Sequence, residues 1–139
     1  DVNEVLNTVN KKPGILGMPG GVSSDFRDVQ KAQGEGNHKA DVAIQAFIYR
    51  VAKYIGAYVA AMNGVDAIVF TAGVGENDKP IRGAVCEYLG YLGIEIDPEI
   101  NKARGKRVTI STPESKVKVC VIPTNEELSI ARETLALVK

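Results

Sequence analysis

The chain has 139 residues, of which 45% are hydrophobic, and its 17 lysines and arginines balance 17 aspartates and glutamates. This length suits one domain with a buried core, and a neutral chain without long charge blocks excludes an extended basic surface for nucleic acid and favours a small-molecule ligand. No apolar run is long enough to span a membrane and no signal-peptide pattern is found, so we expect a cytoplasmic protein.

The first 36 residues predict a connector that carries one polar loop. A short helix is expected over residues 4–10, and the prolines and glycines at 12–14 and 19–21 mark turns. The loop at 23–28 could hold an adenosine, with the base stacked on Phe26 or on the Arg27 plane and Asp25 accepting from the ribose or the amine. Equally, Ser24 or Asp25 could cap a turn while Arg27 pairs with Asp28.

A long amphipathic helix is predicted over residues 38–62, with Asn63-Gly64 as its stop. His38, the only histidine, is expected to be a surface or helix-start residue. The apolar positions recur at helical spacing and predict a core-facing stripe, which comprises Ala43, Phe47, Val51, Tyr54, Ile55, Tyr58 and Met62.

Residues 65–70 predict a strand that is buried on both faces, and a glycine turn and a helix follow it directly. Asn77 or Asp78 would cap this helix, Pro80 would lie in its first turn, and its apolar face would run to residue 92. Gly73 and Gly75 allow a tight turn and a close ligand approach, and the helix start offers unpaired N–H groups. This arrangement favours a phosphate or ribose, although such glycines are also used for steric reasons alone.

After Gly93, residues 94–96 are expected to be extended and Asp97-Pro98 to turn. Residues 107–111 and 116–122 read as strands of a hairpin, which brings the expected total to about four strands and three or four helices. The last helix is expected over 126–138, with Thr124 and Glu127 as a capping box and Leu128, Ala131, Leu135 and Val138 facing inward.

Residues 122–128 repeat the pattern of a strand end followed by a helix start, and here an acidic pair occupies the first turn. A carboxylate of this pair could hold Mg²⁺ beside bound phosphates, because the carboxyl ends of strands in an open sheet face the ligand crevice. The simpler interpretation makes Glu127 a cap and Glu126 a solvated charge. Cys86 and Cys120 are too few for a metal cluster and are expected to be buried free thiols in a reducing compartment.

Together, the segments at 21–28, 70–77, 93–97 and 122–128 resemble the C-terminal part of the acetate kinase family, which includes propionate and butyrate kinases. The resemblance covers essentially the whole chain. It implies a cytoplasmic homodimer that reversibly transfers the ATP γ-phosphoryl group to a short-chain carboxylate with Mg²⁺. It also implies an α/β fold, an incomplete C-terminal domain of the ribonuclease H-like superfamily of sugar kinases, heat-shock chaperone ATPases and actin.

The resemblance assigns roles by position. Residues 1–36 form the connector and the adenosine-side loop, and 37–139 form the nucleotide-binding portion. The nucleotide would be bound by Asp25, Phe26 and Arg27, by Gly73, Val74, Gly75, Glu76 and Asn77, and by Arg82 near the adenine or ribose; Glu126 would be linked to Mg²⁺.

No catalytic residue is expected in this chain, because the family's Mg²⁺-linked asparagine and its phosphoryl-stabilising arginines, aspartate and histidine match no residue here. The isolated chain is therefore expected to be inactive. Pro19-Gly20 is a minor departure from the family pattern.

Two alternatives remain open. In a Rossmann-like domain that binds a dinucleotide or S-adenosylmethionine, the fingerprint would be Gly73-Val74-Gly75, and Glu95 or Asp97 would contact the ribose. That fingerprint's third glycine is replaced by Asp78. A noncatalytic chain that docks its tyrosine-rich helix on a partner is the other alternative.

Overall fold

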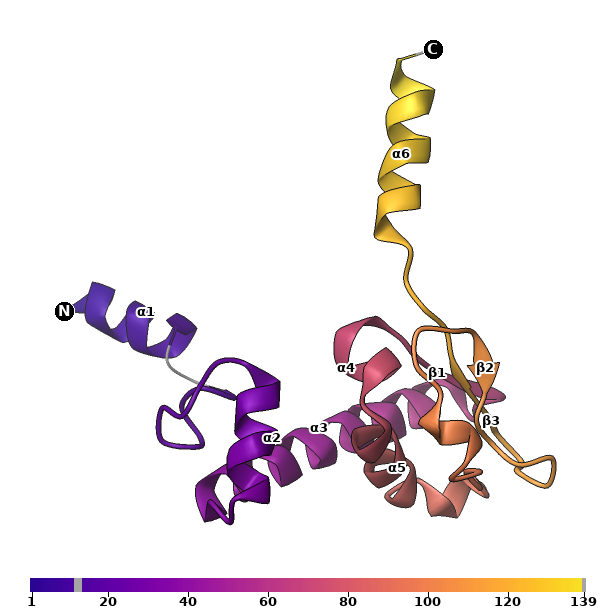
Figure 1. Ribbon diagram of the computed structural model, residues 1–139, viewed down its shortest axis with the longest axis horizontal. Coiled ribbons are helices and arrows are strands. Elements are labelled where there is room, and N and C mark those ends of the chain that lie inside the picture. Colours follow the sequence, from indigo (N-terminus) through magenta and orange to yellow (C-terminus); the bar gives the residue numbers. More distant parts are fainter. Residues whose placement is uncertain (12–13, 139) are drawn as a thin grey trace. The chain divides into compact units, whose positions relative to one another are not determined.

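The computed structural model describes residues 1–11 and 14–138 and divides into two compact units, Asp1–Lys53 and Tyr54–Lys139 (Figure 1). The boundary lies inside a long helix, whereas the sequence placed a division between residues 36 and 37. Of the turn expected at residues 12–14, residues 12 and 13 lie outside the described residues.

The first unit contains α1 (Val2–Lys11), α2 (Phe26–Gly34) and the first part of α3 (His38–Met62). The helix predicted at 4–10 is confirmed as α1. The sequence did not predict α2, which begins directly after Asp25 because the Asp25 side chain accepts a hydrogen bond from the Arg27 N–H. Val29 of α2 is fully buried, so this helix contributes to the core of the unit.

Helix α3 confirms both predicted bounds. Asn37 Oδ1 accepts from the N–H groups of Lys39 and Ala40 at its start. At its end, Asn63 and Gly64 have φ angles of 57° and 137°, the left-handed conformation that stops a helix. His38 is exposed at the first helical position, as expected.

The core-facing stripe of α3 differs from the predicted one. Its buried residues are Ala40, Ala43, Ile44, Ile48 and Ala52, so of the predicted stripe only Ala43 is buried. Tyr54, Tyr58 and Met62 are exposed. Apolar character recurs on more than one face of this helix, and a periodicity taken from the aromatic residues therefore selected the wrong face.

The second unit contains a sheet with strand order β1-β3-β2, formed by β1 (Ala67–Phe70), β2 (Val108–Thr109) and β3 (Lys118–Val121). β1 runs parallel to β3, and β2 pairs with β3 in antiparallel fashion, which confirms the predicted hairpin. Of four expected strands, three form in the described residues, since 94–96 makes only the single bridge Ile96–Ser111. β1 is not buried on both faces, because Val69 is 49% exposed.

Four short helical segments lie between β1 and β2: α4 (Ala72–Asn77), α5 (Lys79–Glu87), η1 (Gly90–Leu92) and η2 (Ile100–Lys102). Asp78 caps α5 through Ile81 N–H at 3.1 Å, and a proline lies in its first turn, as predicted. The helix expected to run to residue 92 instead ends at Glu87, and η1 continues to Gly93, whose φ of 71° closes the turn.

Helix α6 (Glu126–Leu137) confirms the position of the last predicted helix but corrects its cap and its inward face. Asn125 is the cap, with Oδ1 accepting from Leu128 N–H at 3.0 Å. Thr124 is engaged elsewhere, so the predicted capping box does not form. No residue of α6 is buried, and Leu128, Leu135 and Val138 are exposed.

Both cysteines are free thiols, Cys86 buried and Cys120 half-buried. Burial raises the pKa of Cys86 to about 12, which keeps this thiol protonated at neutral pH. In the part of the chain that the structure describes, no helix combines the length and apolar character that crossing a membrane requires.

Candidate functional site

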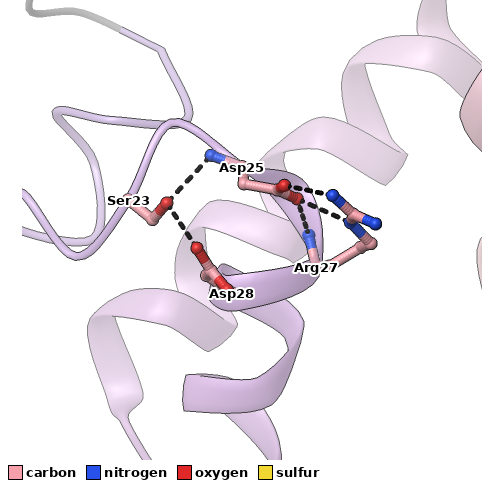
Figure 2. Close-up of polar contacts among 4 residues, drawn as sticks. All are labelled: Ser23, Asp25, Arg27 and Asp28. Carbon is pink, nitrogen blue, oxygen red and sulfur yellow. Dashed lines mark hydrogen bonds and ion pairs between the residues drawn. The ribbon is translucent and has the colours of Figure 1, made fainter.

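Residues 23–28, which comprise the end of the loop and the first turn of α2, are held by contacts among themselves (Figure 2). Asp25 Oδ1 accepts from Arg27 N–H at 2.9 Å and from Arg27 Nε at 3.1 Å, and Oδ2 accepts from Arg27 Nη2 at 2.6 Å. Ser23 Oγ donates to Asp28 Oδ2 at 2.8 Å and accepts from Asp25 N–H at 3.0 Å. The predicted cap is therefore present, but Arg27 pairs with Asp25, and Asp28 accepts from the Ser23 hydroxyl.

This pairing sets the electrostatics of the loop. The Arg27 guanidinium, followed by the Arg27 N–H, lowers the pKa of Asp25 to about 2. The same pairing raises the pKa of Arg27. The Arg27 side chain is 87% exposed, so one face of its guanidinium plane is open for stacking. The half-buried Phe26 ring already contacts Phe47, with centroids 4.9 Å apart and planes tilted by 59°.

The expected glycine turn after β1 is the short helix α4, and its two glycines have different environments. A Cβ at Gly73 would meet nothing within 4 Å, so the main chain there is open to a ligand. A Cβ at Gly75 would lie 3.3 Å from the Phe70 carbonyl carbon, so this glycine allows α4 to pack on the strand end. The left-handed residue of the turn is neither glycine but Ala72, with φ of 58°.

The Val74 carbonyl and the Asn77 side chain both form hydrogen bonds that stabilise α4. The Val74 carbonyl accepts from Asp78 N–H at 2.9 Å, and Asn77 Nδ2 donates to the Gly73 carbonyl at 2.9 Å. Both contacts fix the main chain of the phosphate-side loop, defined as residues 73–77. Contacts within the chain therefore order the loop without a ligand.

Arg82 has no exposed surface, and its guanidinium donates five hydrogen bonds to oxygen atoms. Nε donates to Asn101 Oδ1 at 2.8 Å, and Nη1 donates to the carbonyls of Gly75 and Glu76, each at 2.9 Å. Nη2 donates to the carbonyls of Asn101 and Ala103 at 2.6 and 3.1 Å. Every donor of the guanidinium is occupied by a protein oxygen, so Arg82 offers none to a ligand here, and its place near adenine or ribose stays a prediction.

The physical role of Arg82 follows from where those carbonyls lie. The carbonyls of Gly75 and Glu76 belong to the C-terminal turn of α4, where helix carbonyls lack partners and the dipole favours a cation. Burial is the main cause that lowers the pKa of Arg82, yet a guanidinium remains charged at neutral pH. Arg82 therefore braces the phosphate-side loop against η2.

A second link joins α4 to the acidic loop, defined as residues 122–126. Glu76 Oε1 accepts from Thr124 N–H at 2.8 Å and from Thr124 Oγ at 3.1 Å, across 48 residues of sequence. The same oxygen accepts from Ala72 N–H at 2.8 Å. The bond from the Thr124 N–H is the largest cause that lowers the pKa of Glu76.

Glu126 is the first residue of α6 and is exposed, with Glu127 beside it. Among the described residues, no three histidine, cysteine or acidic side chains gather as a metal-binding cluster. A single exposed carboxylate fits a magnesium ion that is bound by one or two carboxylates together with phosphates and water. It does not make a preformed metal cage.

The sequence did not predict that Asn101 binds Arg82, that Thr124 binds Glu76, or that Arg82 is buried. Asn101 and Thr124 act across 19 and 48 residues, so no local pattern predicts them. The burial of Arg82 had a signal, since Arg82 is spaced i, i+3, i+4 and i+7 from Val85 and Cys86 of α5 and from Leu89 just beyond it, which are all buried.

Residues 1–132 match the model of a protein family described as the Acetokinase family. An acetate kinase from Lachnoclostridium phytofermentans is 61% identical over 137 residues, which cover 99% of this chain and 34% of that protein. The crystal structure of Porphyromonas gingivalis acetate kinase superimposes with a TM-score of 0.90 at 46% identity, covering all of this chain and 35% of that one.

A propionate kinase from Francisella tularensis superimposes with a TM-score of 0.83 at 39% identity, covering 96% of this chain and 33% of that one. The chain thus spans about a third of the length of the relatives it matches. These similarities do not support the Rossmann-like alternative. The structure agrees, because Asp97 Oδ1, a candidate to contact the ribose, accepts from the N–H groups of Glu99 and Ile100.

Proposed function

Because this chain belongs to the acetokinase family, we propose that it is the ATP-binding portion of a kinase that makes an acyl phosphate. The reaction is the reversible transfer of the ATP γ-phosphoryl group to acetate or a similar short-chain carboxylate, leaving ADP. The names of the relatives, acetate kinase and propionate kinase, support this substrate class.

The observation that carries the proposal is the meeting of two family motifs at one edge of the sheet. β1 and β3 are parallel neighbours, and Phe70 pairs with Val121 at their carboxyl ends. The phosphate-side loop follows one strand and the acidic loop follows the other. In open α/β sheets this edge is where ligands bind, which supports a role in holding the phosphates and their metal ion.

The individual roles are proposed from the family pattern. Asp25, Phe26 and Arg27 would contact adenosine, with the exposed Arg27 plane available for stacking. The main chain at Gly73 is open to close approach, and Val74, Gly75, Glu76 and Asn77 would shape the loop around the phosphates. Arg82 would act through the loop carbonyls that it binds. Glu126 would hold Mg²⁺ beside the phosphates.

Phosphoryl transfer depends on positioning and charge neutralisation, and Mg²⁺ supplies part of that neutralisation when it is bound. This chain would supply the nucleotide side of the site. The groups that bind the carboxylate and stabilise the transferred phosphoryl group are assigned to the N-terminal portion of the same protein. We therefore expect this chain by itself to bind ATP without turnover.

The finer assignments of fold and assembly belong to the same proposal. The parallel pair β1–β3 with the helices that follow each strand is consistent with part of a ribonuclease H-like domain of the superfamily of sugar kinases, heat-shock chaperone ATPases and actin. A cytoplasmic homodimer is proposed from the family pattern.

Isothermal titration calorimetry tests the nucleotide assignment. ATP is titrated into the chain with Mg²⁺ and, separately, with EDTA, and NAD and S-adenosylmethionine serve as comparison ligands. We expect selective ATP binding that is tighter with Mg²⁺. Arg27→Ala should weaken binding in both conditions, whereas Glu126→Ala should remove the gain from Mg²⁺.

Two neighbouring residues provide matched controls. Lys31→Ala removes an exposed charge from α2, and Glu127→Ala removes the carboxylate beside Glu126. Both variants should bind ATP as the unchanged chain does. Binding of NAD or S-adenosylmethionine instead of ATP would overturn the proposal, and an equal loss of the Mg²⁺ effect in Glu127→Ala would remove the special role of Glu126.

A further inference from the structure

One carboxylate oxygen joins the two loops of the second unit. Glu76 Oε1 accepts three hydrogen bonds, from Ala72 N–H, Thr124 N–H and Thr124 Oγ, at 2.8, 2.8 and 3.1 Å. Bonds to a charged acceptor are roughly twice as strong as bonds between neutral groups. The side chain that the family pattern places on the nucleotide is thus engaged with protein donors of α4 and of the acidic loop.

The location of this oxygen matters because of where the sheet ends. The ladder between the parallel strands closes with Ile122 N–H donating to the Phe70 carbonyl at 3.0 Å. Beyond this bond, the segment after β1 continues into α4 and the segment after β3 continues into α6. Glu76 joins them beyond that last ladder bond by binding Thr124, which lies two residues before Glu126. It therefore fixes the acidic loop relative to the phosphate-side loop where strand pairing no longer does.

The α4 end of the bridge is itself constrained by two further contacts. Ala72 has φ of 58°, a conformation that a residue with a Cβ rarely adopts, and its N–H is held by Glu76. The Glu76 carbonyl is held by Arg82 Nη1 at 2.9 Å. Because the main chain of Glu76 is fixed by Arg82, its carboxylate acts on Thr124 from a defined position.

The negative charge of Glu76 favours a role in positioning the two loops over direct contact with the phosphates. A carboxylate facing a polyphosphate repels it unless a cation or nearby donors offset its charge, and the groups that offset the charge of Glu76 are donors of Ala72 and Thr124. We propose that Glu76 is a positioning residue that sets the spacing between the phosphate-side loop and the acidic loop, so that the Mg²⁺ response of nucleotide binding depends on Glu76. This inference rests on the proposed function for its ligand and on the Glu76–Thr124 bonds for its mechanism.

Hydrogen exchange of the chain without ligand tests the mechanism. In Glu76→Ala, the amides of Ala72 and Thr124 should exchange about tenfold faster together, since each loses a hydrogen bond to a charged group. Glu76→Gln keeps an oxygen acceptor in the same place but removes its charge, and it should restore only part of the protection. Amides of β3 report whether the sheet remains folded, and Glu87→Ala, an exposed glutamate of α5, is the matched control.

Calorimetry tests the consequence for binding. The ratio of ATP affinities with and without Mg²⁺ should fall in Glu76→Ala toward the ratio found in Glu126→Ala, although Glu126 is intact. Thr124→Val, which removes one of the three donors, should give a smaller fall, and Thr124→Ser should retain the ratio. A general loss of stability would weaken both affinities equally and leave the ratio unchanged.

The two experiments distinguish a failure of this inference from a failure of the proposed function. Unchanged exchange at Thr124 in Glu76→Ala overturns the positioning role whatever the ligand. Faster exchange with an unchanged Mg²⁺ ratio overturns the dependence of the Mg²⁺ response on Glu76. Absence of ATP binding to the unaltered chain would count against the proposed function, while the exchange experiment would still decide whether Glu76 holds the two loops together.

Discussion

The adenosine-side loop of the first unit and the phosphate-side loop of the second are stabilised in opposite ways. Asp25 and its partners form bonds between residues at most five apart, and those bonds are largely exposed to solvent. The phosphate-side loop is held by Arg82 and by Glu76, whose partners include residues 19 to 48 positions away. One loop carries its own order, and the other depends on the fold around it.

This difference has an energetic consequence. Exposed ion pairs contribute little to stability, whereas a buried charge that loses its partners, or leaves its partners unpaired, costs several kcal/mol as an order of magnitude. Changes at Asp25 or Arg27 should therefore alter ligand binding and local titration with little effect on folding. Changes at Arg82 should unfold the site.

Arg82→Ala should give the largest effect. It leaves the carbonyls of Gly75, Glu76, Asn101 and Ala103 without their buried donor, and we expect a loss of about 3 kcal/mol or more in the free energy of unfolding. Urea unfolding followed through NMR signals of β3 measures it in the second unit. Arg82→Lys keeps the charge but lacks the forked geometry, and it should recover only part of the loss.

Arg104→Ala is the matched control, because Arg104 is an exposed arginine close in sequence to Ala103. Its effect should stay within about 0.5 kcal/mol. If Arg82→Ala were no more destabilising than Arg104→Ala, the contrast between a locally held and a fold-dependent loop would be lost.

The same contrast explains what the sequence could predict. α3, the start of α5 and the strands β1 and β3 are encoded by local periodicity, caps and glycines, and they were predicted near their observed bounds. The Asp25 cap was also predictable, because its partner is two residues away. The Arg82–Asn101 and Glu76–Thr124 contacts were not, since they form only after distant segments meet.

Competition for one side chain explains another failure. Thr124 fits the capping-box pattern, but its hydroxyl and N–H bind Glu76, and Asn125 supplies the cap instead. A local sequence pattern identifies Thr124 as a candidate cap, but it does not predict that Thr124 binds the distant acceptor Glu76 instead. The exposed apolar residues of α6 likewise follow helical spacing without any burial in the described residues.

The two glycines of the phosphate-side loop should respond in opposite directions. Gly75→Ala brings a Cβ to 3.3 Å from the Phe70 main chain, which cannot yield as a flexible side chain would, and should destabilise by about 1 kcal/mol. Gly73→Ala adds a methyl group in open space within a helix, and should stabilise by roughly 0.5 kcal/mol. Urea unfolding of both variants measures the pair.

ATP titration of the same two variants sharpens the comparison. Gly73→Ala should weaken nucleotide binding despite its gain in stability, because the added Cβ occupies the open side of the main chain. Unaltered ATP affinity in a more stable Gly73→Ala protein would mean that the nucleotide does not approach this glycine. The assignment of the phosphate-side loop would then rest on Gly75 to Asn77.

The smallest effect is expected at the adenosine-side loop, where the prediction concerns titration. The Arg27 guanidinium and N–H hold the pKa of Asp25 at about 2, below its ordinary value of 3.8. Because the folded pKa is lowered, the carboxylate favours the folded loop fully above pH 4, and this contribution is lost as the pH falls from about 4 to about 2. Side-chain carboxyl ¹³C NMR should therefore show an Asp25 midpoint near 2.

Arg27→Ala separates the two causes of this shift. It removes the guanidinium but keeps the main-chain N–H at position 27, so the Asp25 midpoint should return toward 3.8 without reaching it. Lys31→Ala, on the same helix, should leave the midpoint where it was. An Asp25 midpoint near 3.8 in the unaltered chain would show that the Arg27–Asp25 pair does not persist in solution. The adenosine-side loop would then also depend on the surrounding fold for its order.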